Sequence, residues 1–145
     1  MVNELNAVLR QLGGASVLGR RVRTNVDLQS AIRAGFPQPV VEKVMHAMGL
    51  NLTELARSLD LSPRSLHRRR SQERLARHES DKLYRLARIA ALAKHSLGDE
   101  DAALRWMRRA NRALGGQAPI ECVDTEPGAR AVENVLGRIA YGGIS

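Results

Sequence analysis

The spacing of apolar residues along this chain predicts a succession of short amphipathic helices. In the first of them, Leu5, Val8, Leu9 and Leu12 would share one face of a helix over residues 3–12. Glycine and proline residues, which favour turns, separate the later apolar stretches from one another. Further helices are predicted over residues 26–34, 41–48, 80–97, 99–110 and 126–141, and the predicted fold class is all-α.

Residues 55–70 follow the pattern of two short helices joined by a tight turn. Leu55, Ala56 and Leu59 form the apolar stripe of the first helix, and the small Ala56 suits the point where two helices cross. Asp60 falls in the turn, where a positive φ is needed and where aspartate is tolerated better than most residues. The arrangement is typical of a DNA-binding helix-turn-helix whose first helix opens at Asn51 or Leu52.

The second helix of this unit begins at Ser62-Pro63, a capping hydroxyl followed by proline at the first helical position. Leu66 would turn inward, and most side chains around it are arginine, serine or histidine. Arg69 stands where an aliphatic residue is more usual in such helices. The alternative is a solvated helical hairpin with an arginine-rich surface, but the cap, the turn, the small residue and the basic face together favour a helix-turn-helix.

The longest predicted helix is capped by Ser80-Asp81 and ends near Leu97. It is apolar over much of its circumference, so it is expected to be central and to contact neighbours on two sides. Its two apolar stripes are Leu83, Leu86, Ala87 and Ala90 on one side and Ile89, Leu92 and Ala93 on the other.

Composition and charge distribution indicate which part of the chain could bind phosphates. Hydrophobic residues make up 43% of the 145 positions, which is typical of a globular chain, and the net charge is +8. Residues 51–97 hold eleven basic and five acidic side chains, whereas residues 98–145 hold six basic and seven acidic ones. The middle of the chain is therefore suited to binding phosphates, and its end is not.

The sequence offers no basis for an enzyme, a metal site or a cofactor site. The four histidines have no mutual i, i+4 spacing, Cys122 is a single cysteine among apolar neighbours, and no phosphate-binding loop is present. Trp106 lies on an apolar helix face and is expected in the core. The N-terminus lacks a signal-peptide pattern and no stretch approaches the roughly 20 apolar residues of a membrane span, so the protein is expected to be cytoplasmic, without a membrane partner.

If Leu66 points inward, helical spacing places four side chains on the outward half of the second helix, where they could contact DNA. They are Arg64, His67, Arg68 and Ser71. Arg68 is the strongest candidate for a bidentate contact to guanine. The two serines near the start of that helix would hydrogen-bond phosphates. The predicted DNA-binding residues are Ser62, Arg64, Ser65, His67, Arg68, Arg69, Arg70 and Ser71.

Short motifs are spread over nearly the whole chain, namely Val17-Leu-Gly-Arg20, Ile32–Pro37, Ser65–Arg69, Glu79–Arg88, Ala103-Leu-Arg-Trp-Met107, Asn111–Gly116, Pro119-Ile-Glu121, Thr125-Glu-Pro-Gly128 and Val135–Gly142. With these motifs, nearly the whole chain resembles the bacterial antitoxins of the Xre/MbcA/ParS type, which are paired with RES-domain toxins. Ala110 departs from a proline common at its position in that family, and Cys122 from a usual leucine.

The resemblance implies a type II antitoxin that binds a cognate NAD-degrading toxin, covers its active site and represses its own operon through the helix-turn-helix. It also implies antitoxin dimers within larger complexes. The near-neutral, small-residue end of the chain could enter a partner's cleft, and an alternative is that Arg138 and Tyr141 only cap the last helix before a disordered tail. The predicted toxin-binding residues are Arg138, Tyr141, Gly142, Gly143, Ile144 and Ser145.

We expect three regions: N-terminal helices over 1–50 with a possible role in dimerisation, the helix-turn-helix with its connecting helix over 51–97, and a toxin-binding domain over 98–145. The expected partners are a RES-domain toxin, operator DNA and a second copy of the chain. The main alternative is a freestanding helix-turn-helix regulator whose C-terminal domain binds a ligand or dimerises. An RNA-binding adaptor is disfavoured, because aromatics make up only 3% of the chain and exposed stacking platforms are missing.

Overall fold

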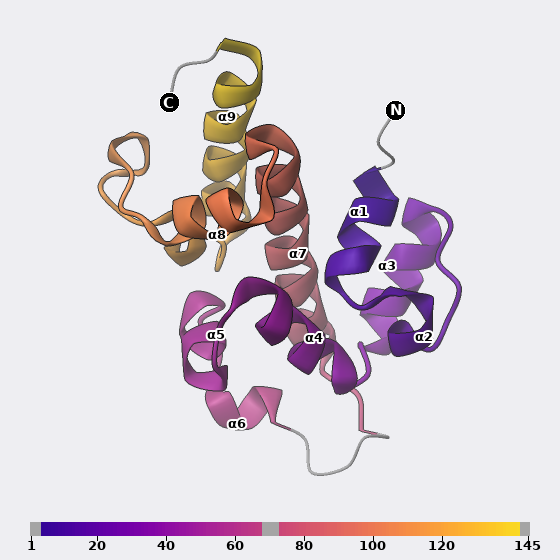
Figure 1. The fold of residues 1–145 in the computed structure, drawn as a ribbon. Coiled ribbons are helices and arrows are strands. Elements are labelled where there is room, and N and C mark those ends of the chain that lie inside the picture. The colour runs from indigo at the N-terminus through magenta and orange to yellow at the C-terminus, as the bar shows by residue number, and fades with distance from the viewer. Residues whose placement is uncertain (1–3, 68–72, 143–145) are drawn as a thin grey trace.

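The computed structural model describes residues 4–67 and 73–142, and every regular element in these two segments is a helix (Figure 1). The predicted all-α fold is therefore confirmed for the described residues. In chain order the helices are α1 (Glu4–Gln11), α2 (Gly14–Leu18), α3 (Asn25–Ala34), α4 (Pro39–Met48), α5 (Leu52–Ser58), α6 (Pro63–Leu66), α7 (Arg77–Leu97), α8 (Glu100–Arg108), the 3₁₀ helices η1 (Arg112–Leu114) and η2 (Pro119–Glu121), and α9 (Glu126–Gly142).

Helix α7 is the axis on which the other helices pack. It lies between the N-terminal helices α1 and α3 on one side and α8 and α9 on the other (Figure 1). Leu83, Leu86 and Ile89 are fully buried along it, and Ala93 is buried one turn further on. The prediction that this helix contacts neighbours on two sides is confirmed.

The start of α7 differs from the prediction. The helix begins at Arg77, one turn before Ser80-Asp81, and the Glu79 carboxylate accepts a 2.6 Å hydrogen bond from the Ala76 amide. Ser80 is fully buried, and its hydroxyl accepts from the Phe36 amide at 2.8 Å and donates to the Ala76 carbonyl at 3.0 Å. The serine does not cap its own helix because its hydroxyl holds the end of α3 against the start of α7.

The remaining boundaries mostly follow local capping chemistry. The side chains of Thr24 and Asp27 form a reciprocal capping box at the start of α3. Helix α2 was not predicted, because its five residues are too short to show a helical period. Gly13, which precedes α2, and Gly14, its first residue, turn the chain with positive φ values.

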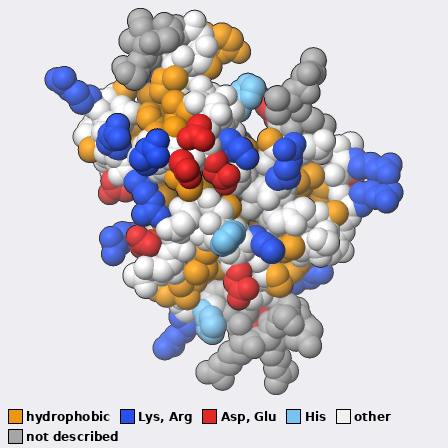
Figure 2. All heavy atoms as spheres, in the orientation of Figure 1, with side chains coloured by type: hydrophobic (Ala, Val, Ile, Leu, Met, Phe, Trp, Pro, Cys, Tyr) orange, Lys and Arg blue, Asp and Glu red, His pale blue; other side chains and the backbone are white. Residues whose placement is uncertain are grey.

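The surface carries charges of both signs. On the face seen in Figure 2, Lys, Arg, Asp and Glu side chains are mixed over α8, α1 and α4, with no separation of charge by sign. None of the described helices has both the length and the apolar character that crossing a membrane requires.

Candidate functional site

The first helix of the helix-turn-helix, α5, is fixed at its start by a second capping box. The Asn51 side chain accepts from the Glu54 amide at 2.8 Å, and the Glu54 carboxylate accepts from the Asn51 amide at 3.0 Å. Leu55 and Leu59 are fully buried on the inner face of the helix. The prediction that the unit opens at Asn51 or Leu52 is confirmed, because Asn51 is the cap and Leu52 the first helical residue.

The turn after α5 depends on Asp60. Its φ is 53°, and no other non-glycine residue among those described has a positive φ. The Leu61 amide then donates to the carbonyl of Ala56 at 2.8 Å, which closes the turn directly beneath the small residue. The predicted positive φ at Asp60 is confirmed.

Helix α6 is shorter than the sequence suggested. The Ser62 hydroxyl accepts from the Ser65 amide at 3.0 Å, Pro63 occupies the first turn, and Leu66 is fully buried. The helix ends at Leu66, and His67 has an extended backbone with φ −90° and ψ 112°. The prediction that Arg64 and His67 share one helix face is therefore wrong.

The physical reason for the early end is a lack of apolar anchors. After Leu66 the next buried hydrophobic residue that the structure describes is Leu75. Arg69 stands where an aliphatic side chain would be needed to hold a second turn of α6 against the core. A helix of this length is stable only where tertiary packing supports it.

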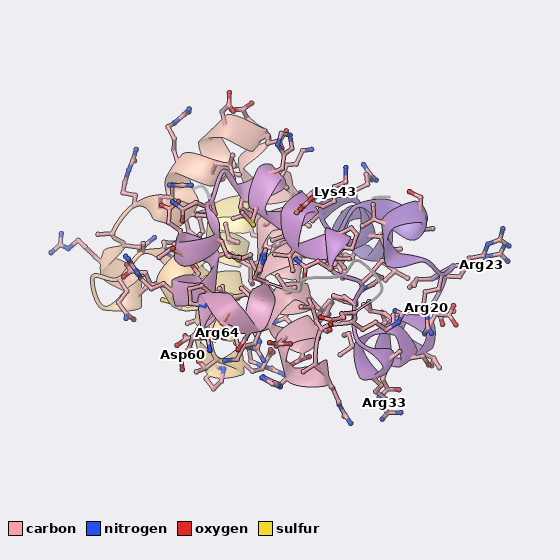
Figure 3. All side chains as sticks on the ribbon, turned by 90° about the horizontal axis from the view of Figure 1, so that it is seen from below. Arg20, Arg23, Arg33, Lys43, Asp60 and Arg64 are labelled. Atoms are coloured by element: carbon pink, nitrogen blue, oxygen red, sulfur yellow. The ribbon has the colours of Figure 1, made fainter. Side chains whose placement is uncertain are left out.

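The predicted DNA-binding residues are placed only in part. Arg64 and His67 are exposed near the lower end of the molecule, and Figure 3 shows Arg64 there beside Asp60. The hydroxyls of Ser62 and Ser65 lie 2.7 Å apart and hydrogen-bond each other within the cap. Arg68, Arg69, Arg70 and Ser71 lie outside the described residues.

Arg74 and Arg77, near the start of α7, differ in their surroundings. Arg74 donates to the carbonyl of Gly35 at 3.0 Å, and the adjacent Leu75 amide donates to the carbonyl of Phe36 at 2.9 Å. Arg74 therefore holds the chain against the end of α3, whereas Arg77 is exposed in the first turn of α7.

The C-terminal helix is held on α7 by an ion-pair cluster that the sequence analysis missed. Arg85 and Arg88 of α7 lie 3.2 and 3.1 Å from the Glu126 carboxylate, and Arg88 also lies 3.3 Å from Glu133. The Arg88 guanidinium is 5.7 Å from the centre of the Tyr84 ring. The cluster fixes the first turns of α9 along the axis of the molecule.

Glu126 shows the electrostatic effect of this cluster. Its partial burial would by itself raise its pKa, but the hydrogen bonds and charges of Arg88 and Arg85 outweigh burial and hold the pKa below its ordinary value. Glu126 therefore stays ionised and remains an ion-pair partner at neutral pH.

The far end of α9 is the most exposed part of the C-terminal half. Arg138 is exposed, Tyr141 is 95% exposed, and Gly142 is the last helical residue. This end of α9 and helix α6 lie at opposite ends of the molecule (Figure 1). Of the predicted toxin-binding residues, Gly143, Ile144 and Ser145 lie outside the described residues.

The segment between α8 and α9 is a compact, hydrogen-bonded turn. Asn111 organises its first part, because its side chain accepts from the Ala113 amide and its carbonyl from the Gly116 amide, both at 2.9 Å. Cys122 is buried, as predicted, and burial together with the nearby Glu121 and Asp124 carboxylates raises the pKa of its thiol. The thiol is therefore a packing group rather than a thiolate nucleophile.

Arg108 of α8 connects the C-terminal half with the helix-turn-helix. Its guanidinium donates to the carbonyls of Met48 and Gly49 at the end of α4, the first of these at 3.3 Å. It also lies 3.9 Å from the carboxylate of Glu54 on α5. One side chain thus spans three helices.

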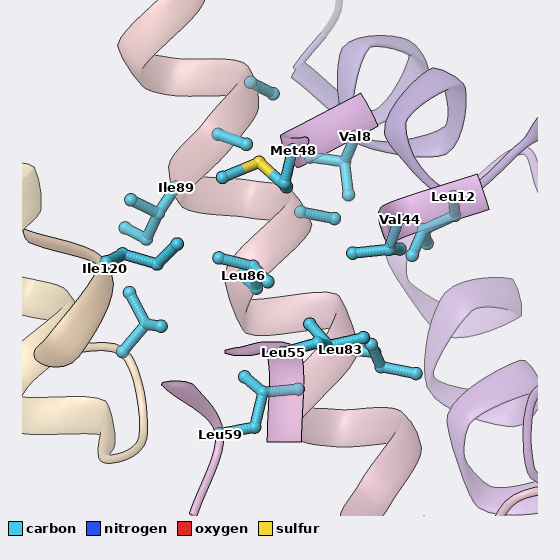
Figure 4. Close-up of a cluster of buried hydrophobic side chains, with 14 of the residues drawn as sticks. Val8, Leu12, Val44, Met48, Leu55, Leu59, Leu83, Leu86, Ile89 and Ile120 are labelled. Carbon is cyan, nitrogen blue, oxygen red and sulfur yellow. The ribbon is translucent and has the colours of Figure 1, made fainter. Parts of the chain in front are cut away.

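A continuous apolar core joins the same two halves. Helix α5 contacts the 3₁₀ helix η2 directly, and buried aliphatic residues of both belong to the same apolar cluster as those of α7 (Figure 4). The helix-turn-helix and the C-terminal segment are therefore parts of one packed unit. The residues that meet in this region include Leu55, Leu59, Leu83, Leu86, Ile89 and Ile120.

Comparisons with known proteins match both halves. Residues 27–88 match the family model of the antitoxin Xre-like helix-turn-helix domain, and residues 92–142 match that of the antitoxin Xre/MbcA/ParS C-terminal toxin-binding domain. The chain is 32% identical over 122 residues to a protein named antitoxin Xre from Photorhabdus laumondii, with 81% of each chain covered. It is 30% identical over 120 residues to an antitoxin Xre from Yersinia enterocolitica, again with 81% of each covered.

A third relative matches a shorter part of the chain. An antitoxin Xre from Pseudomonas putida is 33% identical over 92 residues, which span 63% of this chain and 58% of the relative. The match to a toxin-binding domain favours an antitoxin over a freestanding regulator with a ligand-binding C-terminal domain.

Proposed function

The chain belongs to the Xre antitoxin family, with a helix-turn-helix domain and a toxin-binding domain of type II antitoxins, and on that premise we propose a specific partner and mode of action. Its toxin is a RES-domain enzyme that degrades NAD, and the antitoxin covers the active site of that enzyme. The same chain represses its own operon by binding operator DNA.

The observation that carries the toxin-binding part is the position of the end of α9. Helix α9 is anchored at its start by Arg85 and Arg88, and its last turn projects away from the rest of the molecule with Tyr141 exposed. A rigid helix whose tip carries Arg138, Tyr141 and a small-residue tail can enter a concave active site with little loss of conformational entropy.

The DNA-binding part is supported by the helix-turn-helix at the opposite end. With α6 and the C-terminal end of α9 at opposite ends of the molecule (Figure 1), one chain can bind DNA and a toxin without the two partners competing for space. A single recognition segment buries too little surface for tight specific binding, so a dimer is proposed, with an interface among the N-terminal helices of residues 1–50.

Truncation of the chain tests the toxin-binding part. A chain that ends at Ala140 keeps every α7–α9 ion pair but lacks Tyr141 and the residues after it. Co-expressed with the RES-domain protein of the neighbouring gene, it is expected to leave cells unprotected, whereas the full chain protects them and restores their NAD content. Undiminished protection by the truncated chain would overturn the proposed mode of inhibition.

A second arm tests the DNA-binding part. The full chain is expected to bind the promoter of its own operon with an affinity that falls steeply as salt is raised. Arg68→Ala is expected to weaken this binding and to leave toxin binding intact. Promoter binding that is unchanged at every salt concentration would show that Arg68 is not a recognition residue.

A further inference from the structure

The loop between α2 and α3 carries three arginines that the helix-turn-helix does not account for. Arg20, Arg21 and Arg23 fall within five residues of Gly19, and all three are exposed. The loop precedes residues 27–88, so it lies outside the part of the chain that matches the helix-turn-helix family.

The loop is held in place although it has no regular structure. Leu18 before it and Val22 in its middle are buried, so the chain is fixed to the core on both sides of Arg20 and Arg21. At its far end the amides of Arg23 and Thr24 donate to the Asp27 carboxylate at 2.9 and 3.2 Å. With Val22 turned inward, the neighbouring Arg21 and Arg23 are directed to solvent, and a partner would meet a loop whose backbone is already ordered.

The charges of Arg20 and Arg21 are not neutralised within the described parts of the chain. Neither side chain makes a hydrogen bond or an ion pair with a described residue. Arg23 differs, because it lies near Asp27, and its amide and its charge both help to lower the pKa of that carboxyl. The positive potential of the loop therefore rests mainly on Arg20 and Arg21.

The loop begins on the same half of the molecule as the helix-turn-helix. Figure 1 shows α6 at the lower end and α2 beside α4, with the α2–α3 loop along the side of the molecule, and Figure 3, which views the molecule from below, shows Arg20 and Arg64 on its two sides with Arg33 below Arg20. Helix α2 packs on α4, the helix that leads into the helix-turn-helix. A duplex docked on α6 would therefore run along a face that carries further arginines.

We propose that Arg20 and Arg21 bind backbone phosphates of the same DNA duplex that the helix-turn-helix binds, beyond the groove that faces α6. This inference rests on the DNA-binding part of the proposed function. Duplex DNA is favoured over single-stranded RNA because the only strongly exposed aromatic side chain among the described residues, Tyr141, lies at the opposite end of the molecule.

The experiment compares two double variants of the full chain. Arg20→Ala/Arg21→Ala removes the loop charges, and Arg105→Ala/Arg112→Ala removes two exposed arginines of the C-terminal half as a matched control. Binding to a duplex of the operon's own promoter is measured as the salt concentration is raised. Each lost phosphate contact reduces the magnitude of the slope of log K against log salt by about 0.9, so the loop variant is expected to lose about 1.8 for each chain bound, or about 3.6 for the proposed dimer.

Over a fourfold rise in salt, the affinity of the wild type should fall about tenfold more than that of the loop variant for each chain bound, or about a hundredfold more for the proposed dimer. The control should keep the wild-type slope, and Arg20→Lys/Arg21→Lys should restore it. A loop variant with the wild-type slope overturns the inference about the loop alone. A wild type that binds promoter and random duplexes equally weakly overturns the proposed operator binding itself.

Tests with other polyanions show whether the loop binds a partner other than DNA. The same variants are tested against a single-stranded RNA and against anionic phospholipid vesicles. If the loop variant loses binding to either of these while its slope on DNA is unchanged, the loop serves a different partner and the inference is wrong.

Discussion

The guanidinium of Arg88 lies 3.1 Å from the carboxylate of Glu126, across the interface between α7 and α9. Because Arg88 and Arg85 hold the pKa of Glu126 below its ordinary value, the charged carboxylate contributes stability above the unfolded-state pKa of about 4.3. That contribution is lost as the pH falls through the lower pKa of the folded state. Glu126→Gln is therefore expected to lower the free energy of unfolding at pH 7 more than at pH 3.

Urea unfolding at a series of pH values measures this difference. Glu42→Gln is the matched control, because Glu42 is exposed in the first turn of α4 and makes no ion pair with a described residue. A Glu126→Gln variant whose stability changes with pH as steeply as that of the wild type would contradict the role given to the ion-pair cluster.

A second prediction concerns the buried hydroxyl of Ser80. Ser80→Ala leaves the amide of Phe36 without its acceptor in a site that water does not reach. An unsatisfied buried amide costs about 1–3 kcal/mol, so the free energy of unfolding is expected to fall by that amount. Ser30→Ala, on the exposed side of α3, is expected to change stability by less than about 0.5 kcal/mol. Equal effects of the two substitutions would show that the Phe36–Ser80 hydrogen bond adds nothing to stability.

Substitutions of two glycines in α9 are expected to change the stability of the fold in opposite directions. A Cβ atom at Gly128 would lie 1.9 Å from the carbonyl oxygen of Cys122, whereas one at Gly137 would meet no atom within 4 Å. Gly128→Ala is expected to destabilise the fold by about 1–3 kcal/mol because the backbone must move apart. Gly137→Ala is expected to stabilise it by about 0.5–1 kcal/mol through higher helix propensity. Thermal unfolding of both variants measures whether each is more or less stable than the wild type. A change in the same direction for both would contradict the packing described for the start of α9.

Features set by nearest neighbours in the chain could be predicted from the sequence. The caps at Thr24 and Asn51 and the positive φ of Asp60 follow from local hydrogen bonding and sterics, and the structure has each of them. The central position of α7 was predictable as well, because an apolar surface over much of a helix must be covered on more than one side.

Features set by contacts between distant segments could not be predicted. Ser80 has the residue type of a helix cap, but its hydroxyl bonds Phe36, 44 positions away in the chain. Glu126 and Glu133 could be placed on one face of α9, but nothing local shows that this face meets Arg88. For α6, the missing apolar anchor at Arg69 was visible in the sequence, and it was the signal that the helix would end early.

The last prediction concerns the link between the two halves of the molecule. Arg108→Ala removes the donor that the carbonyls of Met48 and Gly49 share at the end of α4, and it removes the positive charge beside Glu54. Because the carbonyls regain water and the side chain is 42% exposed, the loss of stability should be modest, about 1 kcal/mol. The control is Arg105→Ala on the same helix, because the Arg105 side chain makes no hydrogen bond or ion pair with another described residue. This substitution is expected to leave the free energy of unfolding unchanged.

Hydrogen exchange gives this prediction a local readout. Amides in the last turn of α4 and the first turn of α5 should exchange faster in Arg108→Ala than in Arg105→Ala, while those in the middle of α7 stay equally protected because its packing is untouched. Exchange that is equal in the two variants at α4 and α5 would mean that the shared core alone holds the helix-turn-helix against the C-terminal half. In that case Arg108 would be a surface residue without a structural role.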